Sequence, residues 1–170
     1  MPRVTRALVA VHLSLFGLGC AHPASSRARA SDEREVKIAA YRHLLLAPGT
    51  PGQLLVNCLS DSSHGVYADA APEVLEAFRS APELVAAESA CRSNNPAQLP
   101  LRYRGEVLEQ ARRINVVYLE LGEPGSARVA VWITGCPPGR NSCLGAGYSL
   151  ELRREGGTWV VVKVDLGGIS

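Results

Sequence analysis

The sequence predicts an α+β domain in which an N-terminal helix packs on a curved antiparallel sheet of about four strands. Apolar residues recur at helical spacing after Asp32, whereas from Arg112 onward the apolar period changes to two. Turn residues separate these later runs. A chain of 170 residues is about one domain, so helix and sheet are expected to share one core over 32–170.

The composition excludes several classes of protein. Eighteen Lys and Arg nearly balance sixteen Asp and Glu, and the arginines are scattered along the chain. No basic stripe is present to recruit nucleic acid, so no nucleic-acid partner is predicted. The hydrophobic fraction of 46% can support a packed core and argues against disorder.

The N-terminus has the pattern of a signal peptide over 1–19. Two arginines and no acid precede Ala7–Gly19, an apolar stretch broken only by His12 and Ser14. A helix of this length rises about 20 Å, which is short of the roughly 30 Å hydrocarbon core, so export is favoured over a permanent membrane span.

The stretch ends at Gly17-Leu18-Gly19-Cys20, which resembles the lipobox of bacterial lipoproteins. The resemblance implies that Cys20 is acylated, with a palmitate-type chain, and becomes the new N-terminus. Ala21 at the next position implies sorting to the outer membrane. The motif more often has Leu or Val where Gly17 stands, and ordinary cleavage after Gly19 or near 28–30 is the alternative.

The mature chain is predicted to begin with a tether and then a helix. Residues 20–31 are small, polar and basic after the cysteine, which is typical of a flexible linker. Asp32 can cap a helix with Glu35 three residues later, and the helix ends by Pro48-Gly49. Its inner face is formed by Val36, Ala40 and Leu44.

Further elements follow from turn chemistry and periodicity. Residues 54–59 are either a buried strand or continued helix, and Pro72–Phe78 is a short helix. Asn115–Leu121 is strand-like and the turn 123–126 leads into a second strand with Val129, Val131 and Ile133 on one face. Residues 148–153 and 158–164 form another hairpin around Gly156-Gly157.

The final hairpin, Tyr148 to Val161, resembles the terminal hairpin of small exported bacterial proteins with cystatin-like or nuclear-transport-factor-2-like folds. Cys58-Leu59-Ser60, the Pro72–Phe78 helix, Ser89-Ala90-Cys91 and the closing Ile169-Ser170 are similar to a family of uncharacterised small exported lipoproteins. The resemblance spans roughly 35–170. It implies an α+β fold of the cystatin-like or nuclear-transport-factor-2-like type. It implies no particular activity, because such folds host enzymes, ligand binders and inert partners.

Four cysteines remain after Cys20, and export places them in an oxidising compartment. Cys136 and Cys143 bracket a turn-rich loop between two predicted strands, so we pair them, which leaves Cys58 with Cys91. The alternative is a zinc site, but the C-x-x-C spacing is missing and no metal is predicted.

No catalytic motif or cofactor site is predicted. Ser60, Asp61 and His64 are close in sequence but lack a nucleophile elbow. His43 suits a helix C-terminus better than a catalytic base. Gly145-Ala146-Gly147 precedes a strand instead of a helix, so it is interpreted as a bend or bulge and not as a phosphate loop.

Trp132 and Trp159 each fall on the face opposite the aliphatic residues of their strands. They could stack on a ligand ring. The structural alternatives are a cross-strand aromatic pair or a cover for the far side of the sheet.

Two functions remain open. The favoured one is a non-catalytic envelope lipoprotein that binds another envelope protein or a small ligand. The alternative is a small enzyme of the nuclear-transport-factor-2-like type, with Tyr41, His43 and Asp61 in a pocket between the helix and the sheet. A protease inhibitor is a third possibility that no motif supports. Convergence of at least two of these polar residues in an apolar cavity would favour the enzyme, and a filled core with an exposed aromatic face around Trp132 would favour the binder.

Overall fold

The computed structural model describes residues 23–45, 56–62, 67–80, 84–91, 102–103, 106–107, 111–135 and 144–169. The helices are α1 (Pro23–Leu45), α2 (Pro72–Glu76) and α3 (Glu88–Cys91). The strands are β1 (Val56–Asp61), β2 (Ala68–Asp69), β3 (Leu84–Ala87), β4 (Arg102–Tyr103), β5 (Glu106–Val107), β6 (Ala111–Leu121), β7 (Ser126–Gly135), β8 (Leu144–Glu155) and β9 (Thr158–Ile169).

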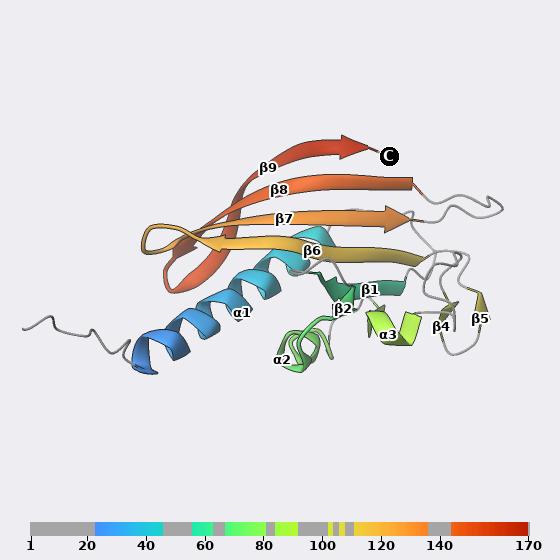
Figure 1. The fold of residues 1–170 in the computed structure, drawn as a ribbon, viewed down its shortest axis with the longest axis horizontal. Helices are drawn as coiled ribbons and strands as arrows, with labels where there is room; N and C mark the ends of the chain where they lie inside the picture. The colour runs from blue at the N-terminus through green and yellow to red at the C-terminus, as the bar shows by residue number, and fades with distance from the viewer. Residues whose placement is uncertain are drawn as a thin grey trace, which may run out of the picture.

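The main sheet is mixed and has seven strands, in the order β2-β1-β6-β7-β8-β9 with β3 also paired to β1 (Figure 1). Strand β1 runs parallel to both β3 and β6, whereas β6 to β9 form an antiparallel meander. The predicted fold class, a helix on about four curved antiparallel strands, is therefore wrong. The meander alone carries a clear period of two, and the strands added around β1 are too short to show one.

Helix α1 begins at Pro23, nine residues before the predicted capping residue Asp32. Proline suits a first helical turn, and the alanines and arginines that follow are good helix formers. Arg29 Nε lies 3.2 Å from Glu33 Oε1, one turn further along. The segment interpreted as a flexible tether is thus helical from Pro23, and Asp32 is an interior helical residue instead of a cap.

The core lies between α1, α2 and one face of the sheet. The predicted inner face of the helix is buried, with Val36 and Ala40 at 0% exposure and Leu44 at 5%. It packs with Leu59, Ile114, Val129, Leu150 and other apolar residues of the strands. The Tyr41 and Phe78 rings meet edge-to-face, with centroids 6.5 Å apart, so the turn after α2 closes the side of this core.

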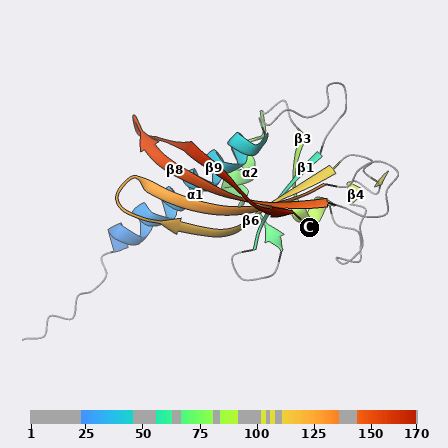
Figure 2. The same cartoon turned by 90° about the horizontal axis from the view of Figure 1, so that it is seen from above.

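Both predicted hairpins are present. Gly125 has φ of 81° at the β6–β7 turn, and Gly156 and Gly157 have φ of 56° and 86° between β8 and β9, as a two-residue type I′ turn requires. Of the two alternatives for residues 54–59, β1 shows that a buried strand is correct from Val56. Figure 2 shows the twist of the sheet and places α1 along its length.

Candidate functional site

The polar residues predicted to meet between the helix and the sheet do not form a catalytic centre. Tyr41 is fully buried, and its hydroxyl donates a hydrogen bond of 2.6 Å to the backbone carbonyl of Ser60. Burial, and to a lesser extent the charge of Asp61, raises the pKa of Tyr41 well above its ordinary range. Tyr41 is therefore held neutral inside the core at physiological pH.

The other two members of that predicted set are also accounted for. Asp61 forms an ion pair with Lys37 of α1, with both side chains about four-fifths buried. His43 is exposed on the helix surface, away from the buried Tyr41. The structure thus places Asp61 near Tyr41 and leaves His43 at the protein surface. Packed apolar side chains of the core surround Tyr41.

A hydrogen-bonded polar chain joins β1 to β6. Ser60 Oγ donates to Asn115 Oδ1 at 3.0 Å, and Asn115 Nδ2 donates to Ser62 Oγ at 2.7 Å. All three residues are buried. Because buried polar groups are stable only when paired, this chain specifies the parallel register of β1 on β6. His64, the third residue of the sequence cluster around Asp61, lies outside the described residues.

A disulfide joins β1 to α3. Cys58 and Cys91 form a disulfide with a Cα–Cα distance of 6.2 Å, which confirms one of the two predicted pairings. Cys20, Cys136 and Cys143 lie outside the described residues. A disulfide indicates an oxidising, exported compartment.

A buried ion pair lies beside this disulfide. Arg113 of β6 binds the fully buried Glu88 of α3 through two contacts, Nε–Oε2 at 2.9 Å and Nη2–Oε1 at 2.6 Å. The guanidinium carbon also lies 4.8 Å from the Tyr67 ring centroid. This bidentate pair fixes α3 on the sheet and is saturated by its own partners, so it has a structural role.

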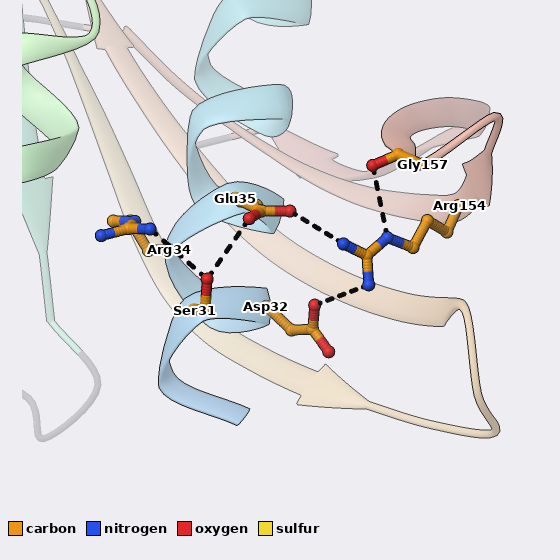
Figure 3. A network of polar contacts seen from close by, with 6 residues as sticks. All are labelled: Ser31, Asp32, Arg34, Glu35, Arg154 and Gly157. Carbon is orange, nitrogen blue, oxygen red and sulfur yellow. Dashed lines mark hydrogen bonds and ion pairs between the residues drawn. The ribbon is translucent and has the colours of Figure 1, made fainter. Parts of the chain in front are cut away.

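Figure 3 shows how the N-terminal half of α1 is attached to the β8–β9 hairpin. Arg154 Nη1 lies 3.1 Å from Asp32, Nη2 lies 3.4 Å from Glu35, and Nε donates to the Gly157 carbonyl at 3.3 Å. Asp32 and Glu35, predicted to form a capping box, are instead acceptors for this arginine. The four groups are partly exposed, so the network orients the helix more than it stabilises the fold.

The two tryptophans lie on opposite faces of the sheet, so they are not a cross-strand pair. Trp159 is 5% exposed within the core, beneath Arg154. Trp132 is half-buried on the other face, where a Cβ built on Gly145 or Gly147 would come within 2.7 or 3.0 Å of its ring. Because neither glycine has a side chain, the Trp132 indole packs directly against the backbone of β8. Predicted ligand stacking is ruled out for the buried Trp159, and Trp132 has one ring face committed to these glycines.

A shallow cavity of about 330 Å³ opens near the β6–β7 turn, lined in part by Glu120, Arg128, Glu151, Arg153 and Val162. Its charges are of both signs, and Arg128 Nη2 lies 3.9 Å from Glu151 Oε1. No single ligand charge is favoured by this lining.

Four exposed apolar residues belong to β9, among them the two most exposed large hydrophobic residues of the described part of the chain. The four are Val162, Val164, Leu166 and Ile169, at 45, 42, 59 and 73% exposure. Strand β9 ends the sheet order, and within the described residues no strand pairs with its outer edge. The sequence shows β9 as an alternating strand, but it cannot show that α1 covers only its first residues. We take the β9 edge as the candidate functional site, because a long apolar edge strand is a template for pairing with another chain.

Comparisons with known proteins found no matching family model, no similar curated protein and no similar solved structure. Among the described helices, none is long and apolar enough to cross a membrane. The described part of the chain also contains no cluster of three or more His, Cys, Asp or Glu residues suited to a metal ion.

Proposed function

We propose that this chain is an exported envelope protein, anchored through an acylated Cys20, whose domain is a non-catalytic interaction module that pairs its β9 edge with an extended strand of an envelope protein. The observation that carries the proposal is the exposed, unpaired edge of β9 with its aliphatic side chains. Main-chain hydrogen bonds along such an edge supply affinity, and alternating side chains supply selectivity.

The buried polar groups favour binding over catalysis. The hydroxyl of Tyr41 and the carboxylate of Asp61 are both engaged in contacts that hold α1 to β1. A general acid or base needs a path to a substrate, and Tyr41 is fully buried in the packed core. The enzyme hypothesis required at least two of Tyr41, His43 and Asp61 to converge in an apolar cavity. Tyr41 and Asp61 do lie close together, but Tyr41 is fully buried among packed core side chains and Asp61 is paired with Lys37.

The sequence supports the anchor, and the disulfide supports export. The apolar stretch before Cys20 favours export, and the disulfide fits an oxidising compartment. Helix α1 starts at Pro23, so only Ala21 and His22 separate it from the proposed acylated residue. An anchored domain would therefore sit next to the membrane surface, with its strands presented to other envelope proteins.

Intact mass of the membrane-fraction protein tests the anchor. The expected product starts at Cys20, carries added acyl mass and has thiols that alkylate only after reduction. A chain cleaved elsewhere, with no acyl mass, would remove the anchor from the proposal. Freely alkylated Cys58 and Cys91 would contradict the disulfide, and with it the assignment to an oxidising compartment.

Photo-crosslinking in intact cells tests the β9 edge. A benzoyl-phenylalanine at position 164 should form protein adducts on irradiation. The same residue at position 117 is the matched control, because Val117 has nearly the same exposure, 43% against 42%, but lies on β6, which β7 and β8 separate from β9. Adducts at position 164 and none at position 117 support an edge interface. Equal yields at both positions, or none at either, would rule it out.

A further inference from the structure

The exposed part of β9 is bounded by two irregularities. Its pairing with β8 is regular from Lys163, opposite Glu151, to Leu166, opposite Tyr148. The register shifts on either side, so that Val162 and Gly167 have no direct partner on β8. Bulges limit how far an edge can pair with another strand, so the segment available for pairing is short and well defined.

Charges alternate with aliphatic residues along this segment. Lys163 Nζ lies 2.7 Å from Asp165 Oδ2 and 3.6 Å from Glu151 Oε1. The hydrogen bond and charge of Asp165, with a smaller contribution from Glu151, raise the pKa of Lys163, so it is protonated at physiological pH. Val164 and Leu166 lie on the other face of the strand, opposite Leu150 and Tyr148 of β8.

This segment is complementary to itself in the antiparallel direction. If a two-fold axis normal to the sheet passes through Val164, that residue faces its own copy. Lys163 of each strand then faces Asp165 of the other, within the segment that pairs regularly with β8. Opposite charges placed across an antiparallel pair stabilise it, as do aliphatic pairs.

The neighbouring registers are unfavourable. Side chains of directly opposed residues share a face, so in every symmetric register the two-fold axis passes through one residue and its own copy. The nearest alternatives to Val164 are therefore Lys163 and Asp165. An axis at Lys163 would place two lysines opposite each other, and an axis at Asp165 would place two aspartates there. Like charges directly opposite each other destabilise a strand pair, so the charges select Val164 as the centre.

We propose that the occupant of the β9 edge is a second copy of this chain, paired antiparallel over Lys163–Asp165 with Val164 on the two-fold axis. This inference rests on the proposed function and names its partner. The pairing joins two seven-stranded sheets into one continuous sheet. Because the ladder is short, membrane anchoring contributes by raising the effective concentration of the two copies.

Cysteine crosslinking tests the register. Directly opposed residues of antiparallel strands have Cα atoms about 4.5–5.5 Å apart, which a disulfide can bridge. Val164→Cys in the full chain in its membrane should therefore form a covalent dimer on mild oxidation. Val117→Cys, with matched exposure away from the edge, and the unsubstituted chain should remain monomeric on a non-reducing gel. Leu166→Cys should crosslink poorly, because it lies two residues from the axis.

A charge exchange in the Val164→Cys background tests the partner residues. Asp165→Lys places lysines opposite each other at two symmetric positions, and the crosslinked fraction should fall about tenfold. Adding Lys163→Glu restores opposite charges and should restore the dimer. The thermal midpoint of each variant, measured in parallel, separates loss of pairing from loss of folding.

The outcomes distinguish this inference from the proposed function. A Val164→Cys dimer that weakens with Asp165→Lys and returns with the double exchange supports self-pairing. If Val164→Cys stays monomeric while position 164 photo-crosslinks to a different protein, the second copy is the wrong partner and the β9 interface stands. If position 164 forms neither a disulfide-linked dimer nor a photo-crosslinked adduct, both proposals fail.

Discussion

At the scale of single residues, the contact between Trp132 and the β8 glycines makes a sharp prediction. A Cβ at Gly145 would lie 2.7 Å from Cζ2 and Nε1 of the indole, closer than real Cβ contacts, so Gly145→Ala must displace the ring or the strand. We expect a loss of about 1–3 kcal/mol in the free energy of unfolding, as for other overpacked sites. Indole fluorescence should also shift to longer wavelength as Trp132 becomes more exposed.

Gly135→Ala is the control, because nothing lies within 4 Å of its added Cβ and it belongs to the same sheet. It should change the free energy of unfolding by less than about 0.5 kcal/mol in urea titrations followed by circular dichroism. Equal effects of the two substitutions would contradict a specific role for the Gly145–Trp132 contact. The sequence predicted only a bend or bulge here. A register shift does occur after Gly147, but the cross-strand contact that requires the glycines depends on pairing with β7.

At the scale of elements, α1 has two parts with different roles. Ala28 is exposed near the start of the helix, whereas Ala40 is fully buried against the sheet. Both Ala28→Gly and Ala40→Gly lower helix propensity by about 1 kcal/mol. Only Ala40→Gly also removes a buried methyl group, so it should lower the thermal midpoint of the whole domain more. Amide hydrogen exchange should show Ala28→Gly speeding exchange mainly near residue 28. A large global loss from Ala28→Gly would show that the first turns belong to the core.

The same elements show what local sequence can predict. The hairpins were predictable because their signals are local: Gly156-Gly157 sets the turn, and the alternation on either side sets the strands. The inner face of α1 followed from the spacing of Val36, Ala40 and Leu44. The placement of β1 between β3 and β6 was not predictable, since parallel pairing joins distant segments and depends on buried contacts such as Ser60 with Asn115. The tether interpretation failed because small residues that suit a linker, such as alanine, also form helices well.

At the scale of the whole molecule, α1, β1 and the meander depend on one another. Arg112 of β6 donates to the Leu44 carbonyl at 2.9 Å, which satisfies an acceptor in the last turn of α1. Tyr41 connects the middle of the same helix to β1 through the Ser60 carbonyl. The disulfide joins β1 to α3, so β1 is connected to the meander by hydrogen bonds on one side and to α3 covalently on the other. Stability of the domain should therefore respond as a unit to a change at Tyr41.

The pH dependence of unfolding tests this coupling. Because burial raises the pKa of Tyr41 in the folded state, the folded chain keeps a proton that the unfolded chain releases near pH 10. The stability from a neutral buried Tyr41 is thus complete below pH 10 and is lost by about 1.4 kcal/mol per pH unit above it. Tyr41→Phe should be about 1–2 kcal/mol less stable at pH 7, where the Ser60 carbonyl loses its donor. That deficit should shrink in urea titrations at pH 10 to 11, because phenylalanine does not ionise. Tyr118, whose pKa is raised by Glu120, is exposed and present in both chains, so its contribution cancels in the comparison. A deficit that stays constant with pH would mean that Tyr41 is accessible to solvent, which would reopen the space between α1 and β1 as a site.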